Sequence, residues 1–286
     1  MRANPTAVHS ANLEELLRTW GLKRAPFSHD EKALELFPSN AGKEARTLLD
    51  TAAALRGVMT LTGSPGIGKS TLVKTWMRSL DPKRHLSLLI TQSSLSATGV
   101  LEILLSKLGE RPRFKRSASL LLLEKHLADI EPVSLVLLLD DAQNYPGPAL
   151  EEIRLLLGIG ARHRNAFTLV LMGDEYLINS LSLSVQRALF TRISAAATLA
   201  PLEREEIPEY LRWHISRAGL ERDIFEPASI DLLAEASDGN PRTLNLLAQA
   251  SWLAAARARA QSVEIEHIHK ALQQVPSART KLPNHP

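Results

Sequence analysis

The sequence contains no cysteine, and only 5% of its residues are aromatic. The absence of cysteine excludes disulfide bonds and cysteine-ligated zinc, and it favours a reducing compartment. Long apolar runs are also missing: none approaches the roughly 20 residues that a membrane-spanning helix needs. The first residues lack the apolar stretch of a signal peptide. We therefore expect a cytoplasmic protein that makes no membrane contact.

What is present has the composition of a globular protein. Hydrophobic residues make up 44% of the 286 residues and charged residues 23%, which is close to the average for soluble domains. This length allows one large domain, or a core with a smaller satellite. The net charge of +3 permits a nucleic-acid partner but does not require one.

Five short apolar runs predict the strands of one sheet. The runs lack the alternation of half-exposed strands, and helical patterns separate them, which indicates a parallel sheet covered on both faces. After Pro201 the strand patterns stop, and the spacing of apolar residues becomes that of four helices. The sequence therefore predicts an α/β core followed by a small all-helical domain. The predicted strands are Val58–Thr62, Leu86–Thr91, Leu135–Leu139, Ala166–Met172 and Arg192–Leu199.

The segment after the first predicted strand reads G-S-P-G-I-G-K-S and matches the phosphate-binding P-loop pattern. Its glycines let the backbone approach phosphate oxygens, and the amides that open the next helix bind the anion. Lys69 should reach the β- and γ-phosphates of ATP, and Ser70 should place its hydroxyl on Mg²⁺. The alternative is an incidental glycine-rich turn, but a strand before and a helix after the motif favour a nucleotide. The expected nucleotide-binding residues are Gly63, Ser64, Pro65, Gly66, Ile67, Gly68, Lys69, Ser70 and Thr71.

Two carboxylates end the third predicted strand. Asp140 and Asp141 follow the apolar run Leu135–Leu139, and ligands bind at this carboxyl edge in open α/β sheets. We expect Asp140 to hold Mg²⁺, directly or through water. The alternative is a solvated strand end, where aspartate is common. Together the two motifs indicate an NTPase that uses ATP and Mg²⁺.

With these motifs in place, the chain resembles the AAA+ ATPases and, within them, the ExeA-type group. Besides the P-loop, three segments carry the resemblance: Gly21–Ser28 (G-L-K-R-A-P-F-S), Leu139–Gln143 (L-D-D-A-Q) and Gly239–Arg242 (G-N-P-R). The resemblance implies a P-loop NTPase of the AAA+ type, with a parallel-sheet core and a C-terminal all-helical lid. The implied domains are an N-terminal segment packing on the core (1–42), the AAA+ core (43–200), the lid (201–275) and a flexible tail (276–286).

ExeA-like ATPases occur in two settings: as a membrane-anchored secretion accessory, and as a short ATPase that accompanies a DDE transposase and is related to MuB and TniB proteins. Because the chain shows neither a membrane span nor a further module, we expect the second setting. The resemblance then implies an ATPase that binds double-stranded DNA without sequence preference and assembles on it as a ring or helical filament. It would select target DNA and activate the transposase. The alternatives are a secretion accessory ATPase and a nucleotide-gated interaction module with little hydrolysis.

The resemblance also assigns catalytic roles around the phosphates. The carboxylate after the metal-binding aspartate is usually a glutamate that activates water. Here it is Asp141, one methylene shorter, so we predict slow hydrolysis unless backbone shifts compensate. Asp174 falls near the family's polar sensor, and its alternative role is to cap the next helix. Arg187 and Arg192 are candidates for the arginine that reaches a neighbouring subunit's γ-phosphate; the alternative for each is an ordinary surface position.

Two more residues have roles that the resemblance implies at the nucleotide. Arg242 matches the sensor-two arginine of AAA+ lids and would couple lid closure to the γ-phosphate. The alternative is that Asn240 and Pro241 merely start a helix there. Phe27 lies in the segment that covers the adenine in relatives, and its ring would suit stacking. Ordinary packing on the core is the alternative for Phe27.

Residues 111–116, which we call the basic loop, place four cations and one aromatic residue between two predicted helices. In MuB-like ATPases, loops in this part of the core line the DNA channel, and cations there would neutralise DNA phosphates. The alternative is a solvated charge cluster. No motif that reads bases is evident. The expected DNA contacts are Arg111, Arg113, Lys115 and Arg116, with a weaker second candidate at Arg162, His163 and Arg164.

Overall fold

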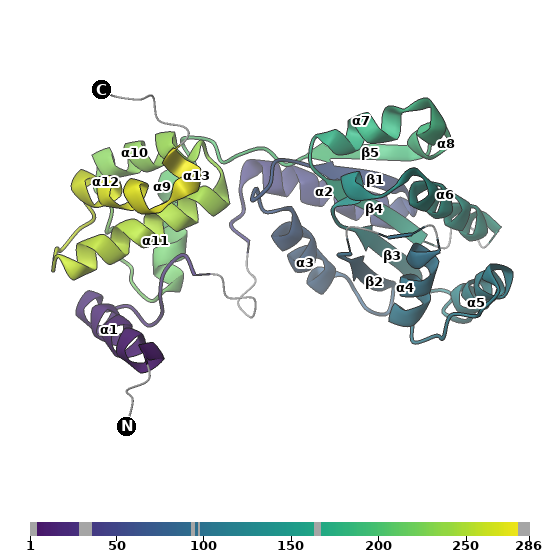
Figure 1. The fold of residues 1–286 in the computed structure, drawn as a ribbon, viewed down its shortest axis with the longest axis horizontal. Coiled ribbons are helices and arrows are strands. Elements are labelled where there is room, and N and C mark those ends of the chain that lie inside the picture. The colour runs from purple at the N-terminus through teal and green to yellow at the C-terminus, as the bar shows by residue number, and fades with distance from the viewer. Residues whose placement is uncertain (1–4, 29–35, 93–94, 97, 163–166, 280–286) are drawn as a thin grey trace. The chain divides into compact units, whose positions relative to one another are not determined.

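A computed structural model of the chain (Figure 1) describes residues 5–28, 36–92, 95–96, 98–162 and 167–279. The chain folds as two compact units, one formed by residues 40–200 and the other by residues 1–39 together with 201–286. We call them the core unit and the helical unit and describe each by itself. The core unit begins at residue 40 and ends at residue 200, close to the range that the sequence suggests.

The core unit is built on one parallel sheet in which the strand order is β2-β3-β4-β1-β5. All four strand pairings are parallel, as the sequence predicts. Strand β1 lies between β4 and β5, so the P-loop leaves the sheet between two neighbouring strands. The strands are β1 (Val58–Thr62), β2 (His85–Ile90), β3 (Ser134–Leu139), β4 (Phe167–Gly173) and β5 (Ile193–Thr198).

Helix α2 precedes the first strand, and among the described residues of the core unit further helices and two short 3-10 turns connect the strands. Their bounds follow from the apolar spacing and the glycine and proline breaks of the sequence. They are α2 (Asn40–Leu55), α3 (Lys69–Ser79), α4 (Gly99–Lys107), α5 (Arg116–Asp129), η2 (Ala142–Asn144), α6 (Gly147–Arg162), α7 (Tyr176–Ser182), η3 (Ser184–Gln186) and α8 (Arg187–Phe190).

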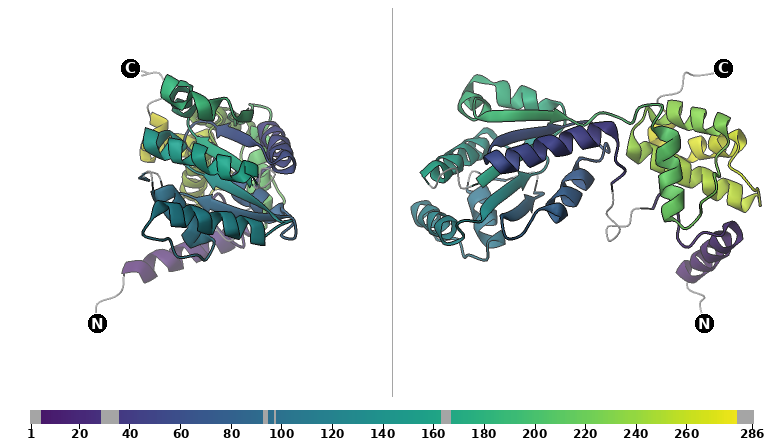
Figure 2. Two further views of the ribbon diagram at one scale, coloured as in Figure 1. Left: turned by 90° about the vertical axis from the view of Figure 1, so that its right-hand side faces the viewer. Right: turned by 180° about the vertical axis from the view of Figure 1, so that it is seen from behind.

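Helices cover both faces of the sheet. Because successive strand residues point to opposite faces, Leu137 and Leu169 join a buried cluster with α4, α5, α6 and α7 on one face. The right-hand view of Figure 2 shows α2 lying lengthwise across the sheet on the face turned to the viewer. A hydrogen bond connects α3 to α2: Trp76 Nε1 of α3 donates to Asp50 Oδ1 of α2 at 2.7 Å.

The edge strands are less covered than the sequence suggests. Strands β1, β3 and β4 are buried at every position, whereas β2 is mostly half-buried and β5 alternates between covered and exposed residues. A helix about 10 Å wide covers about two strands spaced about 4.8 Å apart, so helices packed over the middle of the sheet leave its edges partly open. An edge strand also has a neighbouring strand on one side only. Full coverage on both faces therefore holds for the three central strands.

The helical unit buries its own hydrophobic core. Leu233, Leu244, Trp252 and Ile268 are each fully buried in it. The four helices predicted after Pro201 are present as α9 to α12, and α1 packs on α11 with the Trp20 and Trp252 rings edge to face at 6.5 Å. The helices are α1 (Pro5–Trp20), α9 (Ile207–Arg217), α10 (Pro227–Ser237), α11 (Pro241–Arg257), α12 (Ile265–Gln274) and α13 (Pro276–Arg279).

The N-terminal segment differs from the expectation that it packs on the nucleotide-binding core. Its large apolar side chains are buried within the helical unit instead. Phe37 lies edge to face against Tyr210 at 5.3 Å and Trp213 at 6.1 Å, and Phe27 lies 5.9 Å from Phe225. The reason is that the helical unit offers an aromatic surface on which these rings gain both burial and edge-to-face contacts.

The C-terminal end of the helical unit is also more ordered than expected. Residues 276–279 form α13, and Ala278 is fully buried, so the predicted flexible tail does not start at residue 276. Its remaining part, residues 280–286, lies outside the described residues. Among the residues that the structure describes, no helix has both the length and the apolar character needed to cross a bilayer.

Candidate nucleotide-binding site

The P-loop links β1 to α3, and its path depends on two glycines. Gly63 has φ 153°, and a Cβ there would lie 2.7 Å from the Leu199 carbonyl oxygen, so the turn out of β1 excludes a side chain. Gly68 has φ 105° and directly precedes α3. Apart from the residues directly next to Gly68 in the chain, no described heavy atom lies within 4 Å of the point where its Cβ would be. The start of α3 therefore has the room and the amide donors that an anion needs.

Lys69 opens α3 and turns its ammonium back over the loop. Its Nζ donates to the Gly63 carbonyl oxygen at 2.6 Å and to the Ser64 carbonyl oxygen at 3.3 Å. Ile67 is the one large apolar residue of the loop, and it is only 4% exposed. Burial of this side chain anchors the loop on the core unit. The ammonium is thus held at the loop, where it would meet phosphate oxygens, as the P-loop mechanism requires.

Ser70 and Asp140 come together at the end of the sheet. Ser70 Oγ donates to Asp140 Oδ2 at 3.0 Å, and the Asp141 backbone N–H donates to Asp140 Oδ1 at 3.0 Å. Hydroxyl and carboxylate oxygens are the hard ligands that Mg²⁺ prefers, with water and nucleotide phosphates completing the shell. The described residues contain no group of three or more acidic or histidine side chains that would hold a metal alone. Ser70 and Asp140 therefore fit Mg²⁺ bound together with a nucleotide.

Asp141 lies at the same edge in an unusual backbone conformation. Its φ of 51° is left-handed, a region that aspartate adopts more readily than most residues. Its carbonyl oxygen accepts from the Asn144 N–H at 2.9 Å and so begins η2. The residue is exposed, which suits a carboxylate that has to reach a water molecule.

Two residues just after the paired aspartates, the half-buried Gln143 and the buried Tyr145, each carry a buried polar atom that the sequence alone did not reveal. Tyr145 is 4% exposed, and its hydroxyl has no hydrogen-bond partner among the described residues. Burial, with the negative charges of Asp140 and Asp141, raises the pKa of Tyr145. Gln143 Oε1 also lacks a described partner, and a Cβ on Gly173 would lie 2.6 Å from it. The signal that pointed to Gln143 was its place in the L-D-D-A-Q segment.

The other residues expected near the γ-phosphate lie at the surface of the core unit. Asp174 Oδ1 accepts from the Tyr176 N–H at 3.0 Å, so the side chain satisfies the first amide of α7 from the position before Glu175, which is the N-cap of that helix. A role for Asp174 at the γ-phosphate stays a prediction. Arg187 begins α8 and is exposed, and Arg192 is exposed with its Nη1 donating to the Arg154 carbonyl oxygen at 3.0 Å. An arginine that serves a neighbouring subunit must be accessible, so both arginines stay candidates for that role.

In the helical unit, the G-N-P-R segment builds the start of α11. Asn240 Oδ1 accepts from the backbone N–H groups of Arg242 at 3.1 Å and Thr243 at 3.3 Å. Gly239 has φ 66°, and a Cβ there would lie 2.3 Å from the Leu202 carbonyl oxygen. Helix initiation by Asn240 is therefore present. The Arg242 residue is exposed in the first turn, and its role at a nucleotide stays a prediction.

The basic loop connects α4 to α5, and its four cations are not equivalent. Arg116 forms a two-pronged ion pair with Glu152 of α6, with Nη2 to Oε2 at 2.6 Å and Nε to Oε2 at 3.1 Å. Glu152 is only 5% exposed at its side chain. Arg116 was expected to contact DNA, but it is occupied in neutralising this buried carboxylate. Residues 163 and 164 of the second basic candidate lie outside the described residues.

Arg111, Arg113 and Lys115 of the basic loop are exposed. None of them forms an ion pair with a carboxylate within the described part of the chain. The three remain available for the phosphate contacts that the sequence predicts.

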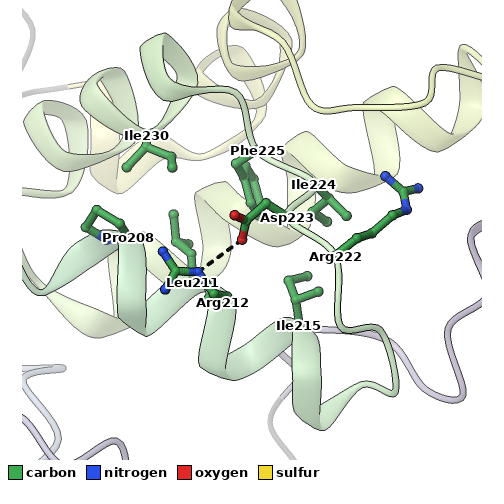
Figure 3. A pocket seen from close by; sticks show the side chains of 9 residues that line it. All are labelled: Pro208, Leu211, Arg212, Ile215, Arg222, Asp223, Ile224, Phe225 and Ile230. Atoms are coloured by element: carbon green, nitrogen blue, oxygen red, sulfur yellow. Dashed lines mark hydrogen bonds and ion pairs between the residues drawn. The ribbon is translucent and has the colours of Figure 1, made fainter.

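A small pocket lies in the helical unit, away from any of these side chains (Figure 3). Its lining is mostly apolar, and its one acidic group is already paired, with Arg212 Nε donating to Asp223 Oδ1 at 3.1 Å. The pocket contains neither the glycine-rich loop nor the magnesium ligands of the core unit, so we assign it no ligand. Its lining residues are Pro208, Leu211, Arg212, Ile215, Arg222, Asp223, Ile224, Phe225 and Ile230.

Comparison with known proteins supports this geometry. Residues 53–181 match the family described as an AAA domain. The chain is similar to General secretion pathway protein A of Aeromonas hydrophila, with 28% identity over 243 residues, which is 82% of this chain and 44% of that protein. The chain thus spans under half the length of this curated relative.

Solved structures show the same fold at low sequence identity. Cdc6p from Pyrobaculum aerophilum has a TM-score of 0.62 at 19% identity, over 91% of this chain and 71% of that one. The Aeropyrum pernix ORC1 protein, solved in complex with DNA, has a TM-score of 0.63 at 16% identity, over 89% of this chain and 72% of that one. With its P-loop, parallel sheet and C-terminal helices, the chain therefore has the P-loop AAA+ fold, and the match to the AAA-domain family lies within its core unit.

Proposed function

We propose that the chain is a magnesium-dependent ATPase that binds double-stranded DNA in its ATP-bound state and regulates a DDE transposase in the cytoplasm. The observation that carries the nucleotide half of the proposal is the 3.0 Å contact between Ser70 and Asp140 beside the P-loop. The transposition half rests on the resemblance to ExeA-like and MuB-like ATPases and on the exposed cations of the basic loop.

Each residue of the site has a role that its position supports. Lys69 would neutralise the β- and γ-phosphates, and Ser70 and Asp140 would hold Mg²⁺. Asp141 would take the proton of the attacking water. Arg187 or Arg192 of a neighbouring copy would stabilise the charge that develops on the phosphate. Mg²⁺ held by Ser70 and Asp140 would neutralise the negative charge that develops on ADP as it leaves.

The DNA half of the proposal is electrostatic. Three exposed cations on one loop can replace the counterions of DNA phosphates, and this gives affinity without sequence preference. Hydrolysis would then release DNA, because assembly into a ring or filament needs ATP at each subunit junction. The ORC1 protein that shares the fold was solved with DNA, which supports DNA as the ligand class.

A second candidate function is favoured by the similarity to General secretion pathway protein A, which extends over 82% of this chain. In that case the ATPase would act on a secretion apparatus, and its nucleotide state would control a protein partner instead of DNA. A third alternative is a nucleotide-gated interaction module with little hydrolysis, for which phosphate release would stay negligible with and without DNA.

A DNA-binding assay under three nucleotide conditions separates these functions. Purified protein is titrated onto labelled duplex DNA with ATP, with ADP and without nucleotide, each with Mg²⁺, and the ATP samples are imaged by electron microscopy. We expect tight binding and ordered assemblies with ATP only. Binding that is absent, or equal under all three conditions, would contradict the proposal and favour the secretion alternative.

A further inference from the structure

The basic loop presents an aromatic ring that packs against nothing. Phe114 is 105% exposed, whereas the other exposed large hydrophobic side chains of the described residues range from 37% to 76%. A phenylalanine ring in water forgoes the burial that stabilises a fold. The packing of the core unit therefore gives no reason for an aromatic residue at this position.

The loop that carries Phe114 is anchored on both sides of the ring. On one side, Ser119 Oγ accepts from the Arg113 N–H at 2.8 Å and donates to the Arg113 carbonyl oxygen at 3.2 Å. Ser119 is 3% exposed. On the other side, the Arg116 guanidinium is held by Glu152. These contacts hold the backbone on both sides of Phe114, so the ring projects into solvent from an anchored loop and not from a loose one.

The charges around the ring are uncompensated. Arg113 and Lys115 flank Phe114 directly, and Arg111 lies two residues further back. The one nearby carboxylate of the loop, Glu110, faces His126 at 3.4 Å. A nucleic acid matches both features of this loop. Its phosphates would pair with the free cations, and its bases would stack on the exposed aromatic ring.

We propose that Phe114 stacks on a DNA base while Arg111, Arg113 and Lys115 hold the neighbouring phosphates. The proposal rests on the DNA binding of the proposed function and adds a preference to it. A ring enters a base stack more easily where the stack is already disturbed. The chain therefore favours DNA with a locally unstacked step over a uniform duplex, and a pre-distorted target is the class of substrate that this loop selects.

The test compares two duplexes of one sequence, one intact and one with a single mismatch next to a fluorescent base analogue, in the presence of ATP and Mg²⁺. We expect the unmodified protein to bind the mismatched duplex more tightly by about 10-fold and to change the fluorescence of the analogue. Phe114→Ala should lose both the preference and the fluorescence change, and Phe114→Trp should keep them. Because the ring is fully exposed, neither variant should change thermal stability.

Arg113→Ala is the matched control for charge. It should keep the preference for the mismatch and lower the slope of log affinity against log salt by about 1, whereas Phe114→Ala should leave that slope unchanged. A Phe114→Ala variant that retains the preference and the fluorescence change would overturn the inference. The inference would also be overturned if Phe114→Ala kept both DNA effects and lost only the response of ATP hydrolysis to added transposase. In that case the ring would contact a protein and not a DNA base. Failure of the unmodified protein to bind either duplex would instead refute the proposed function itself.

Discussion

The Ser70 hydroxyl and the Asp140 carboxylate lie 3.0 Å apart, although 70 residues separate them in the sequence. The first belongs to the opening turn of α3 and the second to the end of β3. A parallel sheet gathers the carboxyl ends of its strands at one edge, which is where such folds bind ligands. This contact therefore marks the place in the core unit where a magnesium-bound triphosphate is expected.

Asp141→Glu should increase the rate of ATP hydrolysis. The aspartate carboxylate is one methylene short of the usual glutamate, and a misplacement of about 1 Å can slow a reaction by on the order of 100-fold. We expect steady-state phosphate release to rise by about 10-fold or more, with ATP affinity unchanged. If Asp141→Glu turns over no faster than the unmodified protein, the left-handed backbone at Asp141 already compensates for the shorter side chain.

Arg116→Ala should destabilise the core unit, and Arg113→Ala should not. Removing Arg116 leaves the buried Glu152 carboxylate without its partner, and breaking a fully buried pair costs about 3–5 kcal/mol. Because the Arg116 side chain is 40% exposed, we expect a smaller loss, about 2 kcal/mol of unfolding free energy. Urea denaturation measures it. The double variant Arg116→Ala, Glu152→Gln should recover part of the loss. If its loss of unfolding free energy instead equals the sum of the losses of the two single variants, the two side chains are not coupled.

Substitution of Asn240 should lower stability, whereas substitution of Arg242 should lower activity. Asn240→Ala removes the acceptor for two backbone N–H groups of α11 and should lower stability by about 1 kcal/mol, while Asn240→Ser should largely restore it. Arg242→Ala should leave stability within about 0.5 kcal/mol but reduce ATP hydrolysis. The measurements are thermal unfolding and phosphate release. Unchanged hydrolysis in Arg242→Ala would leave helix initiation as the only role of the G-N-P-R segment.

The helical unit should lose stability in mild acid because of His214. The His214 ring lies 4.7 Å from Tyr210, 4.8 Å from Trp213 and 5.1 Å from Phe27. Burial, with a smaller effect of the Arg24 charge, lowers the pKa of His214 from 6.5 to about 4. The unfolded chain therefore takes up a proton first as the pH falls below 6.5, whereas the folded state takes it up only near pH 4. The destabilisation of the folded state by His214 is therefore close to zero at pH 7 and above, and it grows as the pH falls from 6.5 towards 4.

Linkage puts the resulting loss at about 2 kcal/mol between pH 7 and pH 5. Urea denaturation followed by tryptophan fluorescence at the two pH values measures it. His214→Phe should reduce the difference between them, and His269→Gln, at an exposed histidine of α12, should not. Equal pH dependence in all three proteins would show that His214 titrates normally in the folded state.

The sequence alone predicts the sheet and the P-loop well, for local reasons. Strands such as β3 and β4 are apolar at nearly every position because both of their faces are buried, so they read as uninterrupted runs. The P-loop is a contiguous motif whose glycines and lysine are needed at fixed spacing. Asn240 was recognisable as a cap because capping involves residues only two or three positions away.

Features that depend on distant partners could not be predicted. Arg116 reads as one more cation of a basic run, and nothing near it indicates that Glu152, 36 residues away, would occupy it. Phe27 and Phe37 read as apolar residues that must be buried, but their spacing does not say which surface buries them. The pairing of Arg113 with Ser119 and the full exposure of Phe114 likewise follow from tertiary structure.

The most direct test of the nucleotide site is the retention of labelled ATP by purified protein with and without Mg²⁺, compared among the unmodified chain, Lys69→Ala and Asp140→Asn, with Asp129→Asn as a surface control. We expect the unmodified chain and Asp129→Asn, whose substituted residue is exposed, to retain ATP in a magnesium-dependent way. Lys69→Ala should retain little under either condition, and Asp140→Asn should lose the dependence on magnesium. Equal retention of ATP by all four proteins, or none by the unmodified chain, would show that Lys69, Ser70 and Asp140 do not form a magnesium-nucleotide site.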